Sequence, residues 1–445
     1  MIDGIFTGVA AIDIGQEKLH VATGGLPAGE AAVSVFGTFT CDLEQLAKYL
    51  STHQVRRVAM EATGVYWVPV YDALQEAGFE VTLFNGLHAR NLPGRKTDVQ
   101  DCQWHAMLHS HGLLKPCFVP PAQILELRSY LRLREDHVSM AASHVQHIHK
   151  SLDLMNVRLH NVISEIQGVS GLKVVDAILN GERDPKRLAE FCSTSILNKK
   201  REKVLRSLRG TWQERHLFAL RQAREGYRFY QGQIAECDRQ IERLLEEWTR
   251  DEEPRQPGPG DKVKPLRHNA PRIPNLHTLM LTFCEGRDPT QISGIGQASH
   301  LKLIGELGTD LSIWPTRKRF ISWLGLADGR HDSGKSRRRV RQPKTKAGQT
   351  FREAAMSVAK STGTALGAFY RRLKARRGHA IALKALARKL AEYYYDVMTK
   401  GLHHVEIGVE RYAAMMRERQ ENYARKLVQR LGWHVVSLET GEVVH

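Results

Sequence analysis

The order of apolar segments near the N-terminus constrains the fold of this chain more than any other feature of its sequence. Residues 7–15, 18–24 and 31–39 are apolar stretches with the pattern of strands, separated by short turns. The segments that follow alternate: a helix at 41–53, a strand at 55–63, a helix at 64–78, a strand at 79–85 and a helix at 98–112. This is the element order of the ribonuclease H-like (RuvC-like) fold. We therefore predict an α/β domain of that class over residues 1–165.

Four acidic residues occupy defined places in this pattern. Asp13 interrupts the first strand and Glu61 the fourth, and an acid in an apolar strand is costly to bury without a partner. Asp98 and Asp101 lie three residues apart at the start of the last helix, so both project from one face of its first turn. Taken by itself, each of these acids could be an ordinary solvated surface charge. Asp98 could also be the N-cap of a helix.

The four carboxylates are predicted to converge, because the ends of the first and fourth strands are neighbours in a ribonuclease H-like sheet and the last helix packs across them. Such a cluster repels itself unless cations bind, and oxygen-only ligands suit Mg²⁺ or Mn²⁺. Two such ions, about 4 Å apart, would hold a phosphodiester and stabilise its attacking and leaving oxygens.

The balance of charge favours a polyanionic partner. The 445 residues include 65 Lys and Arg against 48 Asp and Glu, a net charge of +17, with an isoelectric point near 9.7. Each phosphate neutralised by Lys or Arg releases condensed counterions, so nucleic acid is the expected partner. The sequence contains no apolar run long enough to predict a membrane span. Residues 1–15 lack the features of a signal peptide, and the six cysteines form no Cys-x-x-Cys pair, so we expect a cytoplasmic protein without structural zinc.

A basic segment near the C-terminus contains a serine beside a glycine. Between Arg330 and Lys346 there are eight Lys or Arg and a single acid, Asp332, and Ser333 precedes Gly334. A small hydroxyl beside glycine can approach a phosphate, and guanidinium groups would stabilise the charge of a phosphorane transition state. Chemistry alone favours a loop that only grips phosphates; attack by Ser333 is the alternative. The candidate phosphate-binding residues are Arg330, Lys335, Arg337, Arg338, Arg339, Arg341, Lys344 and Lys346.

Residues 291–315 resemble a helix-hairpin-helix motif. The turn Gly294-Ile295-Gly296 would let backbone amides face a phosphate at a helix N-terminus, and we take Gly294 and Gly296 as nucleic-acid-binding candidates. A Gly-x-Gly turn is common, so it is weak evidence for nucleic-acid binding by itself. Its position near the basic segment strengthens this interpretation. Three histidines share one helix face without partnering acids, so we expect surface or RNA-facing residues and not metal ligands: His137, His144 and His147.

A heptad seam lies in the middle of the chain and predicts a coiled-coil arm within residues 166–250. Its members are Leu220, Ala223, Tyr227, Tyr230, Ile234, Cys237, Ile241, Leu244 and Trp248. The arm would support a homodimer or homotetramer; the alternative is a long helix packed on its own domain. Residues 251–274, rich in Pro, Gly and charge, predict a linker. A mainly helical unit at 275–400 and a basic helical tail at 401–445, ending in a small hairpin, would follow.

Three segments carry a family resemblance. AAIDIGQEKLHVA, VAMEATGVYW and NLPGRKTDVQDCQWHAMLHSHGLL look like the signature blocks of the DEDD transposases of the "insertion sequence one-ten" class. The resemblance covers residues 8–118 and resumes in the C-terminal unit. It implies that Asp13, Glu61, Asp98 and Asp101 form a Mg²⁺ site.

The resemblance also implies a role for the basic segment, because the C-terminal domain of that family has a nucleophilic serine just before a glycine. Ser333 matches this position, with Ser336 as the fallback, since Asp332 stands where many members have a second serine. The basic run that follows matches, and so does a Gly-to-Arg helix start at Gly348 and Arg352, with one intervening residue fewer than in the family.

The resulting hypothesis is a recombinase, nucleoid-associated in a bacterium or archaeon, that cuts and rejoins donor and target DNA. By resemblance, the metal cluster and Ser333 act on one phosphodiester, and a noncoding guide RNA selects the target. The alternative is a metal-only nuclease resembling a Holliday-junction resolvase, in which water attacks. An actin-like phosphotransferase is disfavoured because no second Asp-x-Gly with a nucleotide motif follows, and a nonenzymatic nucleic-acid-binding protein would not need the buried acids.

Overall fold

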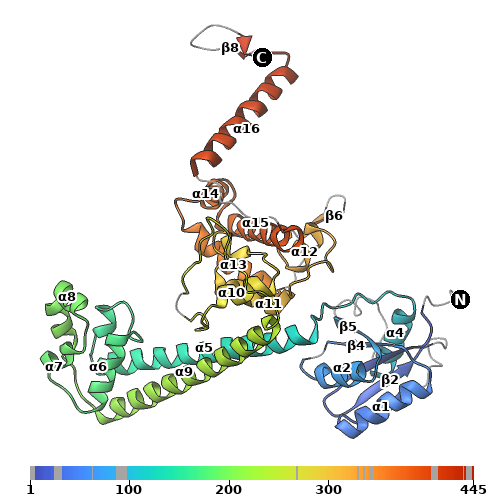
Figure 1. Ribbon diagram of the computed structural model, residues 1–445, viewed down its shortest axis with the longest axis horizontal. Helices are drawn as coiled ribbons and strands as arrows, with labels where there is room; N and C mark the ends of the chain where they lie inside the picture. Colours follow the sequence, from blue (N-terminus) through green and yellow to red (C-terminus); the bar gives the residue numbers. More distant parts are fainter. Residues whose placement is uncertain are drawn as a thin grey trace. The chain divides into compact units, whose positions relative to one another are not determined.

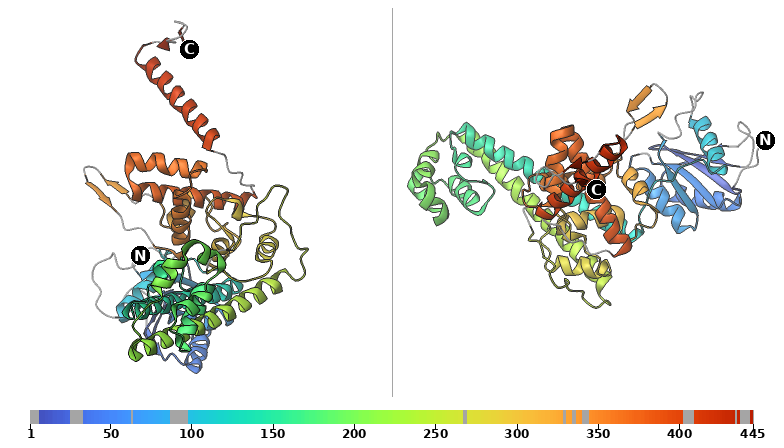
Figure 2. Two further views of the ribbon diagram at one scale, coloured as in Figure 1. Left: turned by 90° about the vertical axis from the view of Figure 1, so that its left-hand side faces the viewer. Right: turned by 90° about the horizontal axis from the view of Figure 1, so that it is seen from above.

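The chain folds into two compact units, Met1–Val119 and Pro120–His445, drawn in Figures 1 and 2. The fold is described from a computed structural model. The residues that it describes are 6–24, 33–62, 64–86, 98–266, 269–327, 330–333, 336–339, 344–401, 409–433, 435–436 and 443–444. The first unit ends before the 165 that the sequence suggested, because the helix that follows it, α5, packs within the second unit.

The first unit is a five-stranded mixed sheet with helices on both faces. Its elements are β1 (Val9–Ile14), β2 (Leu19–Thr23), β3 (Val33–Phe36), α1 (Thr40–Thr52), β4 (Arg57–Glu61), α2 (Trp67–Glu76), β5 (Glu80–Phe84) and α4 (Asp98–Ser110). The strand order is β3-β2-β1-β4-β5: β1, β2 and β3 pair antiparallel, and β4 and β5 run parallel to β1. The predicted element order and the antiparallel opening are confirmed. The central position of β1, between β2 and β4, was not visible in the sequence.

Side chains alternate between the two faces of the sheet, as strand geometry requires. Ile12 of β1 and Met60 of β4 point to one face, where they pack with apolar residues of α1 and α2. Ala11 and Ala59 point to the opposite face, where Cys102 and Ala106 of α4 cover them. The small alanine side chains let α4 lie close to the sheet, and this face carries the acids.

Two long helices, α5 (Ala122–Leu154) and α9 (Glu214–Thr249), lie side by side in the second unit (Figure 1). They run antiparallel: Arg134 bonds Asp238 at one end, and the ring of His144 lies 5.5 Å from that of Tyr230 farther along. The predicted seam on α9 is buried against α5 of the same chain: Ile241 is fully buried, and Ile234 is 8% exposed. This is the intramolecular packing that the sequence left open as the alternative to a coiled coil between subunits.

A small helical cap closes the far end of this α5–α9 arm. It contains η1 (Leu159–Asn161), α6 (Val169–Leu179), α7 (Pro185–Glu190) and α8 (Thr194–Ser207). Its core joins Val174 and Ile178 of α6 to Leu188 of α7 and Val204 of α8, together with the ends of α5 and α9. Arg224 of α9 forms two hydrogen bonds with Asp176 of α6, 2.8 and 2.9 Å long. The cap is therefore fixed to the arm by a shared core and an ion pair.

Because the seam is satisfied within one chain, Ile241→Ala should destabilise the arm by about 2–5 kcal/mol, the cost of a cavity in a packed core. Thermal unfolding followed by circular dichroism measures this loss, and light scattering should give the mass of the wild type. Phe229→Ala is the matched control on the same helix, since Phe229 is 59% exposed and should change stability little. A lowered mass with unchanged stability for Ile241→Ala would instead favour a seam between subunits.

The rest of the second unit is a helical bundle with an extended tail. Its elements are α10 (Leu276–Phe283), η2 (Pro289–Gln291), α11 (Gln297–Leu307), α12 (Arg317–Trp323), β6 (Arg330–Ser333), β7 (Ser336–Arg339), α13 (Lys346–Ala359), α14 (Ala365–Arg377), α15 (His379–Lys400), α16 (Val409–Arg430), β8 (Val435–Val436) and β9 (Val443–Val444). An aromatic core holds α12, α13 and α15 together through Phe320, Phe351 and Tyr394. The segment at 251–274 has no helix or strand among its described residues. The tail contains the antiparallel β8–β9 pair expected from the sequence.

Candidate functional site

Asp13 and Glu61 lie at equivalent positions on neighbouring parallel strands. Ile12 of β1 pairs with Met60 of β4, so the acids that follow them in sequence are adjacent across the two strands. Both are two residues beyond alanines covered by α4, and both therefore share that face of the sheet. The parallel register, which the sequence does not reveal, brings these two predicted site residues together.

A glycine beyond β5 makes room for one of these carboxylates. The Glu61 carboxylate lies over Gly86, where a Cβ atom would come within 2.0 Å of its Oε1. Glu61 is itself the last residue of β4, paired with Phe84 at the end of β5. Its carboxylate is therefore directed to the carboxyl edge of the parallel part of the sheet.

Cys102 ties the first turn of α4 to the sheet beside Asp13. Its thiol donates to the carbonyl oxygens of Ala11, at 3.2 Å, and His20, at 3.1 Å. Burial raises the pKa of the Cys102 thiol to about 12, and the negative charge of Asp13 adds to the effect. The thiol is thus an uncharged hydrogen-bond donor, and Asp101, the preceding residue, is held in the same turn. Sequence reasoning missed Cys102; its position directly after Asp101 was the only available signal.

The donor set at this edge of the sheet fits a hard divalent cation. Asp13, Glu61 and Asp101 offer only carboxylate oxygens, the ligands that Mg²⁺ and Mn²⁺ prefer. Asp98 is the first residue of α4, and its side chain lies outside the described residues. Among the described side chains, no three of His, Cys, Asp or Glu are grouped closely enough to hold a metal ion.

Ser333 is the last residue of β6, in a short hairpin. β6 and β7 pair antiparallel from Arg330 with Arg339 to Ser333 with Ser336. Asp332 pairs with Arg337, so the one acid of the segment is aligned with a basic residue. Where the sequence predicted a loop, the backbone therefore forms a two-stranded ribbon. Outside the described residues lie Lys335, Arg341 and the side chains of Arg330, Ser333, Ser336, Arg337, Arg338 and Arg339.

The chain leading into this hairpin is held by two cations from other helices. The Arg352 guanidinium of α13 donates to the carbonyl of Gly325 at 3.1 Å, and the Lys384 ammonium of α15 donates to that of Ala327 at 2.5 Å. Burial lowers the pKa of Arg352. These contacts hold the segment between the end of α12 at Trp323 and the start of β6 at Arg330.

Gly348, in the first turn of α13, lies against the turn that follows α12. A Cβ atom at Gly348 would lie 2.1 Å from the carbonyl oxygen of Leu324, closer than any side chain tolerates. Thr345 caps α13 by accepting from the amide of Gly348, and its hydroxyl donates to Leu324 at 3.3 Å. The sequence marked Gly348 and Arg352 only as a helix start; in the fold both fasten the base of the hairpin.

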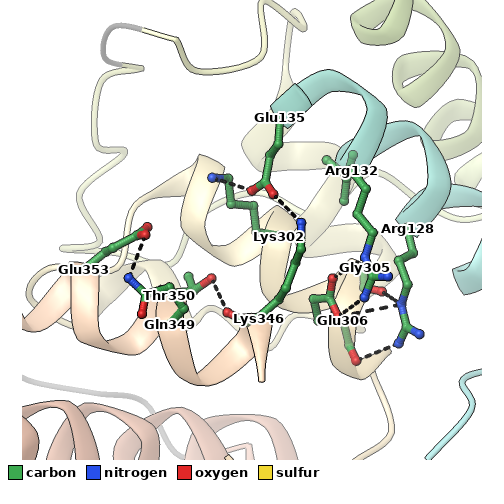
Figure 3. Close-up of a pocket in the computed structure, with 11 residues that line it drawn as sticks. Arg128, Arg132, Glu135, Lys302, Gly305, Glu306, Lys346, Gln349, Thr350 and Glu353 are labelled. Atoms are coloured by element: carbon green, nitrogen blue, oxygen red, sulfur yellow. Dashed lines mark hydrogen bonds and ion pairs between the residues drawn. The ribbon is translucent and has the colours of Figure 1, made fainter. Parts of the chain in front are cut away.

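A charged cavity of about 190 Å³ lies where α5 meets α11 and α13 (Figure 3). Glu135 bridges two lysines, with Lys302 at 2.7 Å and Lys346 at 3.2 Å. Although burial opposes it, hydrogen bonds from both lysines hold the pKa of Glu135 below its usual value. Lys346, a predicted phosphate-binding residue, is thus an ion-pair partner in this fold; both Lys346 and Lys344 are exposed.

The turn before α11 has a backbone conformation that requires glycine, as the sequence predicted. Gly294 has a φ of +84°, and a Cβ atom there would be 2.4 Å from the Val358 side chain. Gly296 is the N-cap of α11 and, having no side chain, supplies no side-chain cap to the first helical amides. Both glycines line a second cavity, of about 580 Å³.

The three histidines that were predicted to share one helix face have different surroundings in the structure. His137 and His144 lie with their rings 5.8 and 5.5 Å from that of Tyr230 on α9, whereas His147 is exposed. Two of the three histidines are therefore part of the α5–α9 packing, and only His147 remains on the surface.

Two protein-family models match this chain. One, the DEDD transposase model of the IS110 class, is described as a transposase and matches residues 10–157. The other, described as the transposase IS116/IS110/IS902 family, matches residues 290–371. The first match includes the four acids and α5, and the second includes the turn at Gly294, the β6–β7 hairpin and α13. No curated protein matches the chain. In the described part of the chain no helix is long and apolar enough to cross a membrane.

Proposed function

The chain belongs to the IS110-class DEDD transposases, enzymes that act on DNA, and from this premise we propose how its residues cut and rejoin DNA strands. In this proposal, Asp13, Glu61, Asp98 and Asp101 form a Mg²⁺ site and Ser333 is the nucleophile. The observation that carries the proposal is the occurrence of both family matches in one chain, each spanning one of the two residue sets.

The proposed metal site is supported by the sheet of the first unit. Its strand order, with three antiparallel strands followed by two parallel ones, is that expected for a ribonuclease H-like domain. Asp13 and Glu61 share the face covered by α4, the helix that begins at Asp98. When bound, Mg²⁺ or Mn²⁺ would polarise the phosphodiester and offset the charge that develops on its oxygens. The carboxylates hold the cation, and the rigid sheet keeps their backbone in place.

The proposed serine step conserves the energy of the phosphodiester. The Ser333 oxygen forms a bond to phosphorus as one strand P–O bond breaks, and the proton of the hydroxyl passes to solvent. The released strand end carries a hydroxyl, and a strand-end hydroxyl later attacks the phosphoserine and restores the serine. Basic residues of the segment 330–346 stabilise the charge on the phosphoryl oxygens. The contacts of Arg352 and Lys384 support this role, because they hold Gly325 and Ala327 in the segment that leads to β6.

RNA guidance and assembly follow from the family resemblance. A noncoding guide RNA pairs with donor and target DNA, while the protein contacts backbone and shape. Donor and target strands require more than one active site, and we propose a homodimer or homotetramer. The buried seam of the arm does not supply its interface, so other surfaces must.

Copurification tests this proposal directly. Full-length protein, expressed with the DNA that flanks its gene, should retain one structured RNA encoded there. With Mg²⁺, the complex should join donor to target DNA, and ribonuclease treatment should abolish joining. Joining by ribonuclease-treated protein at the normal rate would contradict RNA guidance while leaving the chemistry intact.

A further inference from the structure

The far end of the arm carries an accumulation of positive charge that neither family match covers. Residues 199–209, in α8 and the turn after it, contain six Lys or Arg and a single acid, Glu202. We call these six the basic tip: Lys199, Lys200, Arg201, Lys203, Arg206 and Arg209. The family matches end at residue 157 and resume at residue 290, so the basic tip belongs to neither.

All six side chains of the basic tip are exposed. The opposite side of α8 is fixed, since Val204 and Leu208 are fully buried in the core of the cap. Lys200 departs from helical geometry, with φ −145° and ψ 20°, and its ammonium donates to the carbonyl of Val162 at 2.7 Å. The basic tip is therefore an exposed surface of α8, which is broken at Lys200 and packed on its other side into the core of the cap.

The charges of the basic tip have no carboxylate partners among the described residues. Over the described residues, none of its six side chains forms an ion pair with a carboxylate, in contrast to Arg224, which is paired with Asp176 on the same cap. Lys199 and Lys203 lie on either side of the break in the helix at Lys200, and their like charges add to the positive charge of the same exposed segment. Cations near a helix C-terminus complement its dipole, which accounts for Arg206 but not for the two lysines. An unpaired, self-repelling set of this kind is stabilised by a polyanion.

We propose that the basic tip binds the phosphate backbone of duplex DNA that flanks the reacting phosphodiester, without reading its sequence. DNA is the substrate of the family to which the chain belongs. Surfaces for unpaired strands interleave aromatic residues with basic ones for base stacking, and residues 194–210 contain no aromatic residue. The surface therefore fits the backbone of a duplex.

The length of the arm sets the scale of this contact. α5 has 33 residues and extends about 50 Å at ~1.5 Å per residue. At ~3.4 Å per base pair, that length corresponds to roughly 15 base pairs of DNA. The contact should therefore require a duplex that continues for about that length beside the arm.

The test is the salt dependence of DNA binding by the full-length chain, measured without Mg²⁺ so that no strand is cut. Lys199→Ala, Lys203→Ala and Arg206→Ala are combined in one variant. Each lost phosphate contact lowers the slope of log affinity against log salt by about 0.9, so the slope should fall by roughly 3 on a long duplex. On a duplex trimmed by about 15 base pairs of flank, the wild type and the variant should bind alike.

The matched control removes three exposed arginines from the same arm: Arg228→Ala, Arg243→Ala and Arg250→Ala. Its slope on the long duplex should equal that of the wild type. An unchanged slope for the tip variant, an equal fall in the control, or a fall seen with duplex RNA but not with DNA would each overturn the proposal. Circular dichroism confirms folding, which the exposed substitutions leave intact. Because no strand is cut, the result does not depend on the roles proposed for the acids or Ser333.

Discussion

Ser333→Ala should abolish recombination and remove every covalent protein–DNA adduct. The alanine has no oxygen to form the bond to phosphorus, and no other group is proposed to replace it. A reaction stalled on a substrate that cannot be rejoined, resolved on a denaturing gel, should show protein attached to DNA for the wild type only. Binding of DNA should persist, because the eight basic residues of the segment 330–346 remain.

Ser336→Ala is the matched control for this experiment, because Ser336 pairs with Ser333 across the hairpin. It should retain the adduct. If the adduct followed Ser336 instead, the nucleophile would be displaced by three residues while the chemistry stayed the same. Normal recombination by Ser333→Ala would leave the hairpin as a phosphate-gripping element and favour the metal-only nuclease.

Asp13→Asn should lower strand cleavage with Mg²⁺ at least ~100-fold, because a metal ion contributes several kcal/mol to such a reaction and each 1.36 kcal/mol is tenfold in rate. Without Mg²⁺ the variant should be as stable as the wild type or more so, since one of several repelling carboxylates has been neutralised. Added Mg²⁺ should raise the melting temperature of the wild type and not that of the variant. A cleavage assay and thermal unfolding with and without Mg²⁺ measure these effects.

Glu44→Gln is the control for charge, because Glu44 is exposed on α1, a helix on the other face of the sheet from the acids. It should cleave DNA normally and keep the stabilisation by Mg²⁺. Asp101→Asn should behave as Asp13→Asn does. Full cleavage by Asp13→Asn in the presence of Mg²⁺ would remove Asp13 from the site.

The sequence predicted the first unit well because its elements are short and their apolar patterns are local. The strands around Asp13 and Glu61 were recognisable from an acid within an apolar run. Their adjacency depends on the pairing of Ile12 with Met60, a contact between residues 48 positions apart that no local pattern encodes. Glu61 over Gly86 and Cys102 against Ala11 are likewise tertiary contacts.

The second unit was predicted less completely for a related reason. The heptad spacing of Ile234 and Ile241 established an apolar face on α9, but a period cannot say whether the partner helix belongs to the same chain. The anchors of the hairpin, Arg352 and Lys384, are single basic residues among many in the sequence. They differ from the other basic residues in the carbonyl groups that they contact, and these contacts are visible only in the fold.

The pairing of α5 with α9 has a consequence for synthesis on the ribosome. The strands and helices of the first unit lie within residues 9–110, so its sheet can form as soon as that segment emerges. The apolar face of α5 cannot be buried as early, because its partner helix α9 ends at Thr249, about 95 residues after Leu154. At roughly 5–20 residues per second, this face waits for about 5–20 s. The nascent chain is therefore most open to chaperones and to aggregation after the acid-bearing unit has folded and before the arm closes.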